Sequence, residues 1–303
     1  MRCPKCGKTV PKNSLFCGQC GAPLELPEEK PKAGIDESAP YVHPSDRAAL
    51  KALMAIPGFT PALKAFMKTW HETQYRIQNM SSCVRISEKQ LPEYYDMLPP
   101  ICEKLRIDVP ELYLELDVNA NAYTSGDTKP YIVMTSGLLE TLPHELIPTV
   151  LAHECGHIDC HHVLYSTMGR MILNGAATSL NLFGLGNLVS LPLRIAFFYW
   201  MRCSEFSADR AAILCDGGYA KMAEICMRFA GFDKDIHYTA NLDAFMEQAE
   251  EYKEMVASDK WNKTLEFYTL STATHPLTAV RAYEAREWTK TEEYTKLTSG
   301  MLL

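Results

Sequence analysis

The chain has 303 residues, which is enough for one sizeable domain with a small accessory module or for two modest domains. Hydrophobic residues make up 47% of it and charged residues 22%, a composition that excludes a disordered tail or a coiled coil. The chain has 30 Lys and Arg and 37 Asp and Glu, which give a net charge of −7. This charge argues against a protein that binds nucleic acid through a basic surface extending over the whole molecule.

The first twenty residues contain two Cys-x-x-Cys pairs, formed by Cys3 with Cys6 and by Cys17 with Cys20. This spacing is typical of a four-thiolate zinc site, in which every coordination position is filled and the metal is structural. Because so short a unit has no core of its own, the metal would supply its folding free energy. We therefore predict a zinc ribbon over residues 1–21; two disulfides are the alternative.

The next segment, 22–42, predicts a flexible linker. Its prolines stand among charged side chains with few bulky apolar ones, so the segment cannot bury enough surface to offset its chain entropy. No apolar run follows the N-terminus, as a secretory signal would require. Seven further cysteines are scattered singly, which suits a reducing compartment and predicts a cytoplasmic protein.

Residues 43–303 predict a single, mainly helical domain with a small sheet. The pattern indicates helix over 45–79 with breaks at 57–58 and 61, and a second helix over 91–105 that Pro110 closes. Strands are expected at 112–116, around Tyr123, and at 131–134, with a turn at 125–127 between the last two. Thr135 and Ser136 should cap the following helix, and helices dominate from there on. The predicted fold class is α+β.

A candidate catalytic metal site lies on one of these helices, in the sequence His153-Glu154-Cys-Gly-His157. Histidines at i and i+4 share a helix face, so both rings can reach one cation, and Glu154 projects beside it where it can deprotonate a water. Catalytic zinc normally takes a third protein ligand and keeps an open position. His161 is also on the i+4 ladder, but three histidines in line along a helix cannot surround one tetrahedral ion.

The third ligand is expected from a carboxylate further along the chain. No Asp or Glu occurs between Asp159, which faces away from the two histidines, and Glu205, so Glu205 is the leading candidate. Glu205 and Asp209 are again spaced i and i+4 and share a helix face. Asp209 is then placed to accept a hydrogen bond from a ligand histidine and to fix its tautomer.

These residues resemble the HtpX and CAAX-prenyl-protease type of zinc metalloendopeptidases, a gluzincin family. The pieces that carry the resemblance are Asn121-Ala122-Tyr123, residues 135–139, the HExxH helix with His162 five residues on, residues 202–209, and Thr274-His275-Pro276 with Arg281. The resemblance implies a zincin-like fold, Glu205 as third zinc ligand and Glu154 as general base. It further implies that His275 stabilises the oxyanion, that Arg281 pairs with a buried acid, and that an edge strand at Asn121 pairs with extended substrate. Typical members have clear membrane spans, and this chain does not.

Residues 171–193 carry no formal charge and precede a bulky apolar run that ends at Trp200. Their length permits a membrane span, but their asparagines, Pro192 and interior glycines would be costly facing lipid. We expect a helical hairpin near the catalytic cleft whose tip contacts a membrane surface or guides substrate; insertion of 171–201 into a membrane is the alternative.

The sequence thus predicts a zinc-dependent endopeptidase with one catalytic and one structural Zn²⁺ and an extended polypeptide as substrate. Two rival readings stay open. One is a catalytically inert zinc-binding scaffold, and the other is a membrane-embedded processing protease.

Overall fold

A computed structural model describes residues 6, 8, 20, 39–56, 59–66, 72–126, 128–173, 191–233, 239–270 and 277–299 of the chain. The chain divides into two units, Met1–Ser38 and Ala39–Leu303. Tyr41 and Val42, near the start of the second unit, are buried in its core. All helices and strands described below belong to this second unit.

Three helices precede the sheet, α1 (Pro44–Met54), α2 (Phe59–Phe66) and α3 (Glu72–Ser82). They occupy the interval in which the sequence predicts helix, and the break predicted at 57–58 falls between α1 and α2. The break predicted at Pro61 was wrong, because Pro61 lies in the first turn of α2, where its missing N–H has no helical partner to lose. α1 begins where expected for a helix with proline in its first turn, and the ring of His43 accepts a hydrogen bond from the backbone of Ser45 at 3.2 Å.

The helix predicted over 91–105 is two helices, α4 (Pro92–Tyr95) and α5 (Leu98–Leu105). The prediction of one continuous helix was wrong. Pro99 and Pro100 have no backbone N–H, and their rings clash with the carbonyls of a preceding helical turn. The chain can therefore only restart a helix there, with the prolines in its first turn.

The sheet has four strands in the order β1-β2-β4-β3, formed by β1 (Val84–Ile86), β2 (Glu111–Glu115), β3 (Ala122–Ser125) and β4 (Tyr131–Thr135). β2 and β4 are parallel, with Leu112 opposite Ile132, and the other two pairs are antiparallel. The strands predicted near 112, 123 and 131 are confirmed, whereas β1 was not predicted. β3 lies at one edge of the sheet, on the side away from β1.

Helices follow the sheet in the described part of the second unit. They are α6 (Ser136–Thr141), a 3₁₀ turn (His144–Leu146), α7 (Ile147–Asp159), α8 (Val163–Leu173), α10 (Leu191–Asp216), α11 (Ala220–Phe229), α12 (Leu242–Ser258), α13 (Lys260–Leu270), α14 (Thr278–Thr289) and α15 (Glu292–Thr298). The predicted cap of α6 is present, because the hydroxyl of Thr135 accepts a hydrogen bond from the backbone of Leu138.

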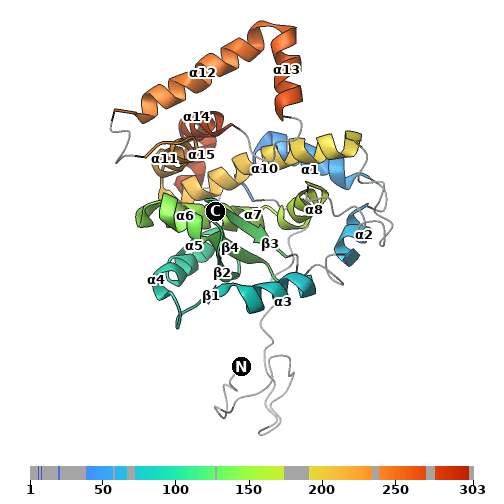
Figure 1. Cartoon of the computed structure of the whole chain (residues 1–303), viewed down its shortest axis with the longest axis vertical. Helices are drawn as coiled ribbons and strands as arrows, with labels where there is room; N and C mark the ends of the chain where they lie inside the picture. The colour runs from blue at the N-terminus through green and yellow to red at the C-terminus, as the bar shows by residue number, and fades with distance from the viewer. Residues whose placement is uncertain are drawn as a thin grey trace. The chain divides into compact units, whose positions relative to one another are not determined.

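The core forms where α7 packs between the sheet and the long helix α10. α7 also contacts α5 and the edge strand β3. In Figure 1 the strands lie at the centre with α3 below them and α10 above, while α12 and α13 project at the top. Leu98, Ile132 and Leu151 are fully buried in this core. The α+β class, mainly helical with a small sheet, is confirmed.

No helix in the described part of the second unit combines the length and the apolar character needed to cross a membrane. Most of the predicted hairpin at 171–193 lies outside the described residues, since 174–190 are not among them. The later part of the apolar region, from Leu191 to Met201, forms the first half of α10.

Candidate metal centre

Two turns of α7 present both histidines of the HExxH sequence to one carboxylate of α10. The Nε2 atoms of His153 and His157 each lie 3.4 Å from an oxygen of Glu205, and one ligand atom from each residue lies within 4.8 Å of the others. All three side chains are buried. The structure therefore brings together the three expected ligands, from two helices that are far apart in sequence.

Small residues allow this close approach. A Cβ placed on Gly156 would lie 2.6 Å from the Cβ of Ala211 and 3.1 Å from the Cα of Ala208. Such contacts are too short for any side chain, so only glycine fits at position 156 with α10 at its present distance. The absence of a side chain at Gly156 thus allows Glu205, on α10, to come close to the two imidazoles on α7.

Glu154 points from α7 toward the edge strand. Its carboxylate Oε2 accepts a hydrogen bond of 2.6 Å from the hydroxyl of Thr124, which also donates to the backbone oxygen of Glu154 at 3.2 Å. Thr124 is in β3, together with the predicted substrate-binding residues Ala122 and Tyr123, and the exposed Asn121 directly precedes the strand. The expected base is therefore held by the strand that was expected to bind substrate.

Asp209 and Arg281 complete one side of the cluster. Asp209 Oδ1 lies 2.9 Å from His153 Nδ1, and Arg281 donates to both oxygens of Asp209 at 2.6 and 2.9 Å. Arg281 Nη1 is also 3.2 Å from Glu205. Burial alone would raise the pKa of Asp209, but Arg281 and His153 outweigh it and lower that pKa, so the carboxylate is ionised.

The electrostatics of the cluster suit a cation. Burial alone would lower the pKa of His153, yet Asp209 and Glu205 raise it to about 10. Burial lowers the pKa of His157, so that ring is neutral and offers a lone pair, and the carboxylates beside His153 would attract a divalent cation that displaces its proton. Two imidazoles and one carboxylate are a donor set that zinc accepts when it keeps an open position. The residues present therefore fit zinc.

His162 and Asp46 were not predicted to take part in the site. His162 is 1% exposed, and its Nδ1 lies 3.0 Å from Nδ1 of His157. Its other ring nitrogen lies 2.8 Å from Asp46, a fully buried carboxylate in the first turn of α1. Asp46 and His162 are 116 positions apart, so no local spacing in the sequence signals this contact.

Other residues weighed from the sequence either take no place in this cluster or lie outside the described residues. His161 is exposed beyond the end of α7 and is not among the three clustered ligands. His275, Cys3 and Cys17 lie outside the described residues. Cys6 and Cys20 are described, but Cys3 and Cys17 are not, so the described residues do not include the complete ribbon site.

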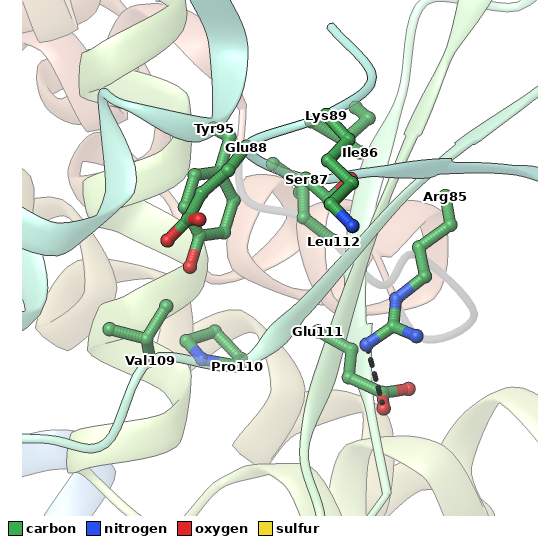
Figure 2. Close-up of a pocket in the computed structure, with 10 residues that line it drawn as sticks. All are labelled: Arg85, Ile86, Ser87, Glu88, Lys89, Tyr95, Val109, Pro110, Glu111 and Leu112. Atoms are coloured by element: carbon green, nitrogen blue, oxygen red, sulfur yellow. Dashed lines mark ion pairs between the residues drawn. The ribbon is translucent and has the colours of Figure 1, made fainter. Parts of the chain in front are cut away.

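A separate pocket of about 310 Å³ lies beside β1, at the opposite edge of the sheet from β3. Figure 2 shows Arg85 paired there with Glu111, at 3.5 Å. Its lining includes Lys89 and Tyr95 but no histidine or cysteine. None of its lining residues belongs to the histidine–carboxylate cluster, so the chemistry expected from the sequence is not located in this pocket.

Comparison with known proteins agrees with the site. Residues 106–289 match the model of peptidase family M48, and residues 2–24 match that of a zinc-ribbon domain. No solved structure matches the chain.

Similar proteins include the plastoglobule-localized metallopeptidase 48, chloroplastic, of Arabidopsis thaliana, which is 33% identical over 85% of this chain and 74% of its own. The protease HtpX homolog 2 of Methanosarcina acetivorans is 24% identical over 53% of this chain and 64% of its own. The protease HtpX homolog of Ralstonia nicotianae is 22% identical over 58% and 68%. The resemblance to HtpX-type proteases is thereby confirmed, and the chain belongs to peptidase family M48, the metallopeptidases, with a zinc-ribbon domain at its N-terminus.

Proposed function

We propose that the chain is an endopeptidase whose catalytic zinc is held by His153, His157 and Glu205. The observation that carries the proposal is the meeting of these three buried donors within 4.8 Å of one another. When bound there, zinc supplies Lewis-acid chemistry, lowering the pKa of a water molecule and polarising the scissile carbonyl. Asp209 holds His153 in the tautomer that leaves Nε2 free for the metal, and Arg281 holds Asp209.

Glu154 acts as the general base in this proposal. Its carboxylate takes the proton from the attacking water and later passes it to the leaving amine. The hydrogen bond from Thr124 fixes one carboxylate oxygen and leaves the other for the proton transfer. His275 would donate a hydrogen bond to the oxyanion, a role that rests on the family resemblance.

The substrate would be an extended polypeptide that adds to the sheet alongside β3, with Asn121, Ala122 and Tyr123 pairing with its backbone. This placement is supported by the edge position of β3 and by the hydrogen bond from Thr124 of β3 to Glu154. Strand addition binds main chain, and it therefore leaves the choice of substrate side chains loose.

The N-terminal part would carry the second, structural zinc. In this proposal Cys3, Cys6, Cys17 and Cys20 close a tetrahedral thiolate site in a ribbon over residues 1–21, joined by the linker 22–42 to a peptidase domain over 43–303. The match of residues 2–24 to a zinc-ribbon domain supports this assignment.

The proposal is tested by Glu154→Gln in the full chain. We expect this variant to keep its zinc and to lose at least about 100-fold in cleavage rate, because the metal ligands stay and the proton acceptor is removed. Mass-spectrometric mapping of cleavage sites in a denatured proteome, with wild type and variant side by side, measures the loss. A His153→Ala variant is the control for metal binding. Unchanged cleavage by Glu154→Gln would dismiss Glu154 as the base.

A further inference from the structure

The C-terminal end of α7 folds His162 back against a metal ligand. The backbone N–H of His162 donates to the carbonyl of His157 at 2.9 Å, and that of His161 donates to Ile158 at 3.1 Å. With His161 at a φ of +58°, these two bonds form a Schellman motif. The motif places His162, which follows the left-handed His161, against the last turn of α7. The rings of His157 and His162 consequently meet with centroids 5.2 Å apart.

The second ring nitrogen of His162, Nε2, contacts the carboxylate of Asp46. The carboxylate lies 2.8 Å from His162 Nε2 and accepts hydrogen bonds from Trp200 Nε1 at 2.9 Å and from the Ser207 hydroxyl at 2.5 Å. Burial alone would raise the pKa of Asp46, but His162 and the other donors outweigh it and lower that pKa. Asp46 is therefore an ionised acceptor, built into the core by donors from α10.

The direction of the hydrogen bonds in the series His157–His162–Asp46 follows from its last acceptor, the carboxylate of Asp46. An ionised carboxylate accepts only, so Nε2 of His162 donates to Asp46, and the neutral form of the ring then offers the lone pair of Nδ1 to His157. His157 then donates from its own Nδ1, and its Nε2 lone pair is left for a metal beside Glu205. Without the carboxylate, neither ring would be restricted to this tautomer.

We propose that Asp46 and His162 are positioning residues for the metal ligand His157, an inference that rests on the proposed metal centre. Each ligand histidine then has its own carboxylate. Asp209 contacts His153 directly, and Asp46 acts on His157 through one intervening imidazole. Asp46 lies outside residues 106–289, which match the peptidase family. The first helix of the second unit is thus part of the metal centre.

The test uses the full chain with Asp46→Asn, His162→Ala and the double variant. Asparagine keeps the size of Asp46 but removes its charge, and alanine removes the relay ring. We expect each single variant to lower zinc affinity about 10- to 100-fold, as loss of outer hydrogen-bond partners of metal ligands does elsewhere. Zinc affinity is measured by competition with a chromogenic chelator, and any zinc on the N-terminal cysteines is common to all variants.

The double variant separates positioning from general stability. If Asp46 acts through His162, Asp46→Asn has no further effect on zinc affinity once His162 is alanine. Additive losses would mean that Asp46 affects zinc binding independently of His162, and would overturn the proposal. Tyr41→Phe is the matched control. It removes a hydrogen bond from the segment before α1 to Asp159 of α7 but touches no ligand, so its zinc affinity should equal that of wild type.

A measurement on wild type covers the case in which the variants do not fold. In the zinc-loaded chain, ¹⁵N spectra of the imidazoles should show His162 protonated on Nε2 and unprotonated on Nδ1; the opposite tautomer would overturn the proposal. Wild-type zinc affinity in the folded variants would overturn it as well. If His153→Ala also keeps wild-type affinity, the proposed metal centre itself fails, and the two failures are thereby distinguished.

Discussion

His161 occupies a backbone position that normally belongs to glycine or asparagine. Its φ of +58° is left-handed, and a residue with a Cβ pays about 1–2 kcal/mol for that conformation. The side chain is exposed, and α7 has already ended at Asp159. Position 161 therefore serves to reverse the chain, and the side chain itself is not required for the metal cluster.

Replacing His161 by glycine should leave zinc binding intact and stabilise the protein by about 0.5–1 kcal/mol, because relief of the left-handed strain exceeds the added chain entropy of glycine. Denaturant unfolding of the zinc-loaded chain measures the stability, and chelator competition measures the zinc. His161→Val, which cannot adopt this conformation easily, is the control and should be less stable than wild type. Loss of zinc in the glycine variant would restore His161 as a candidate ligand.

The sequence predicts the inner residues of the cluster better than the outer ones. His153, Glu154 and His157 follow from helical spacing, and Glu205 follows because few carboxylates are available after them. His162 stands five residues after His157, which on a continuous helix would place it on a different face. Only the left-handed turn at His161 brings it back, and no local pattern announced that turn.

At the scale of helices and strands, hydrophobic periodicity and prolines predicted most of what forms. The strand β2 follows from the alternation at 112–116, and the break near Pro57 follows from proline chemistry. β1 has three residues, too few for any period to be visible. The order β1-β2-β4-β3 depends on pairings between distant segments, which the sequence of each strand does not specify.

The packing of α7 on α10 determines whether the ligands meet. Gly156→Ala would add a Cβ only 2.6 Å from that of Ala211, and the helices must separate to admit it. We expect the variant to lose about 1–3 kcal/mol of stability by overpacking, although alanine is normally the better helix former. Because Glu205 moves with α10, zinc affinity should fall as well.

Thermal unfolding with and without added zinc measures both effects of Gly156→Ala. Ala211→Gly in the same chain is the matched rescue, since it removes the closer of the two atoms that the new Cβ meets. Partial recovery of stability and zinc affinity is expected, because the backbone of Ala208 stays close. A single variant as stable as wild type, with unchanged zinc affinity, would show that the two helices are not in tight contact at this point.

For the whole molecule, the two predicted zinc sites differ in donor chemistry and lie in different units. The histidine–carboxylate cluster belongs to Ala39–Leu303, whereas the paired cysteines belong to Met1–Ser38. Four thiolates leave a zinc ion no open position, while two imidazoles and a carboxylate leave one. The cysteine site should therefore matter for the folding of the short unit, and the histidine–carboxylate site for hydrolysis.

Removing either site separately tests this division. Cys17→Ser with Cys20→Ser should lower the zinc content from two ions per chain to one and leave cleavage of an unfolded protein unchanged, because a half-site of thiolates cannot hold the metal. His153→Ala with His157→Ala should also leave one ion but abolish cleavage. Metal analysis of the dialysed chains and the cleavage assay give both readouts. If the serine variant keeps the zinc of the histidine–carboxylate cluster but loses cleavage, the ribbon takes part in substrate binding. The assignment of a purely structural role to the ribbon would then be wrong.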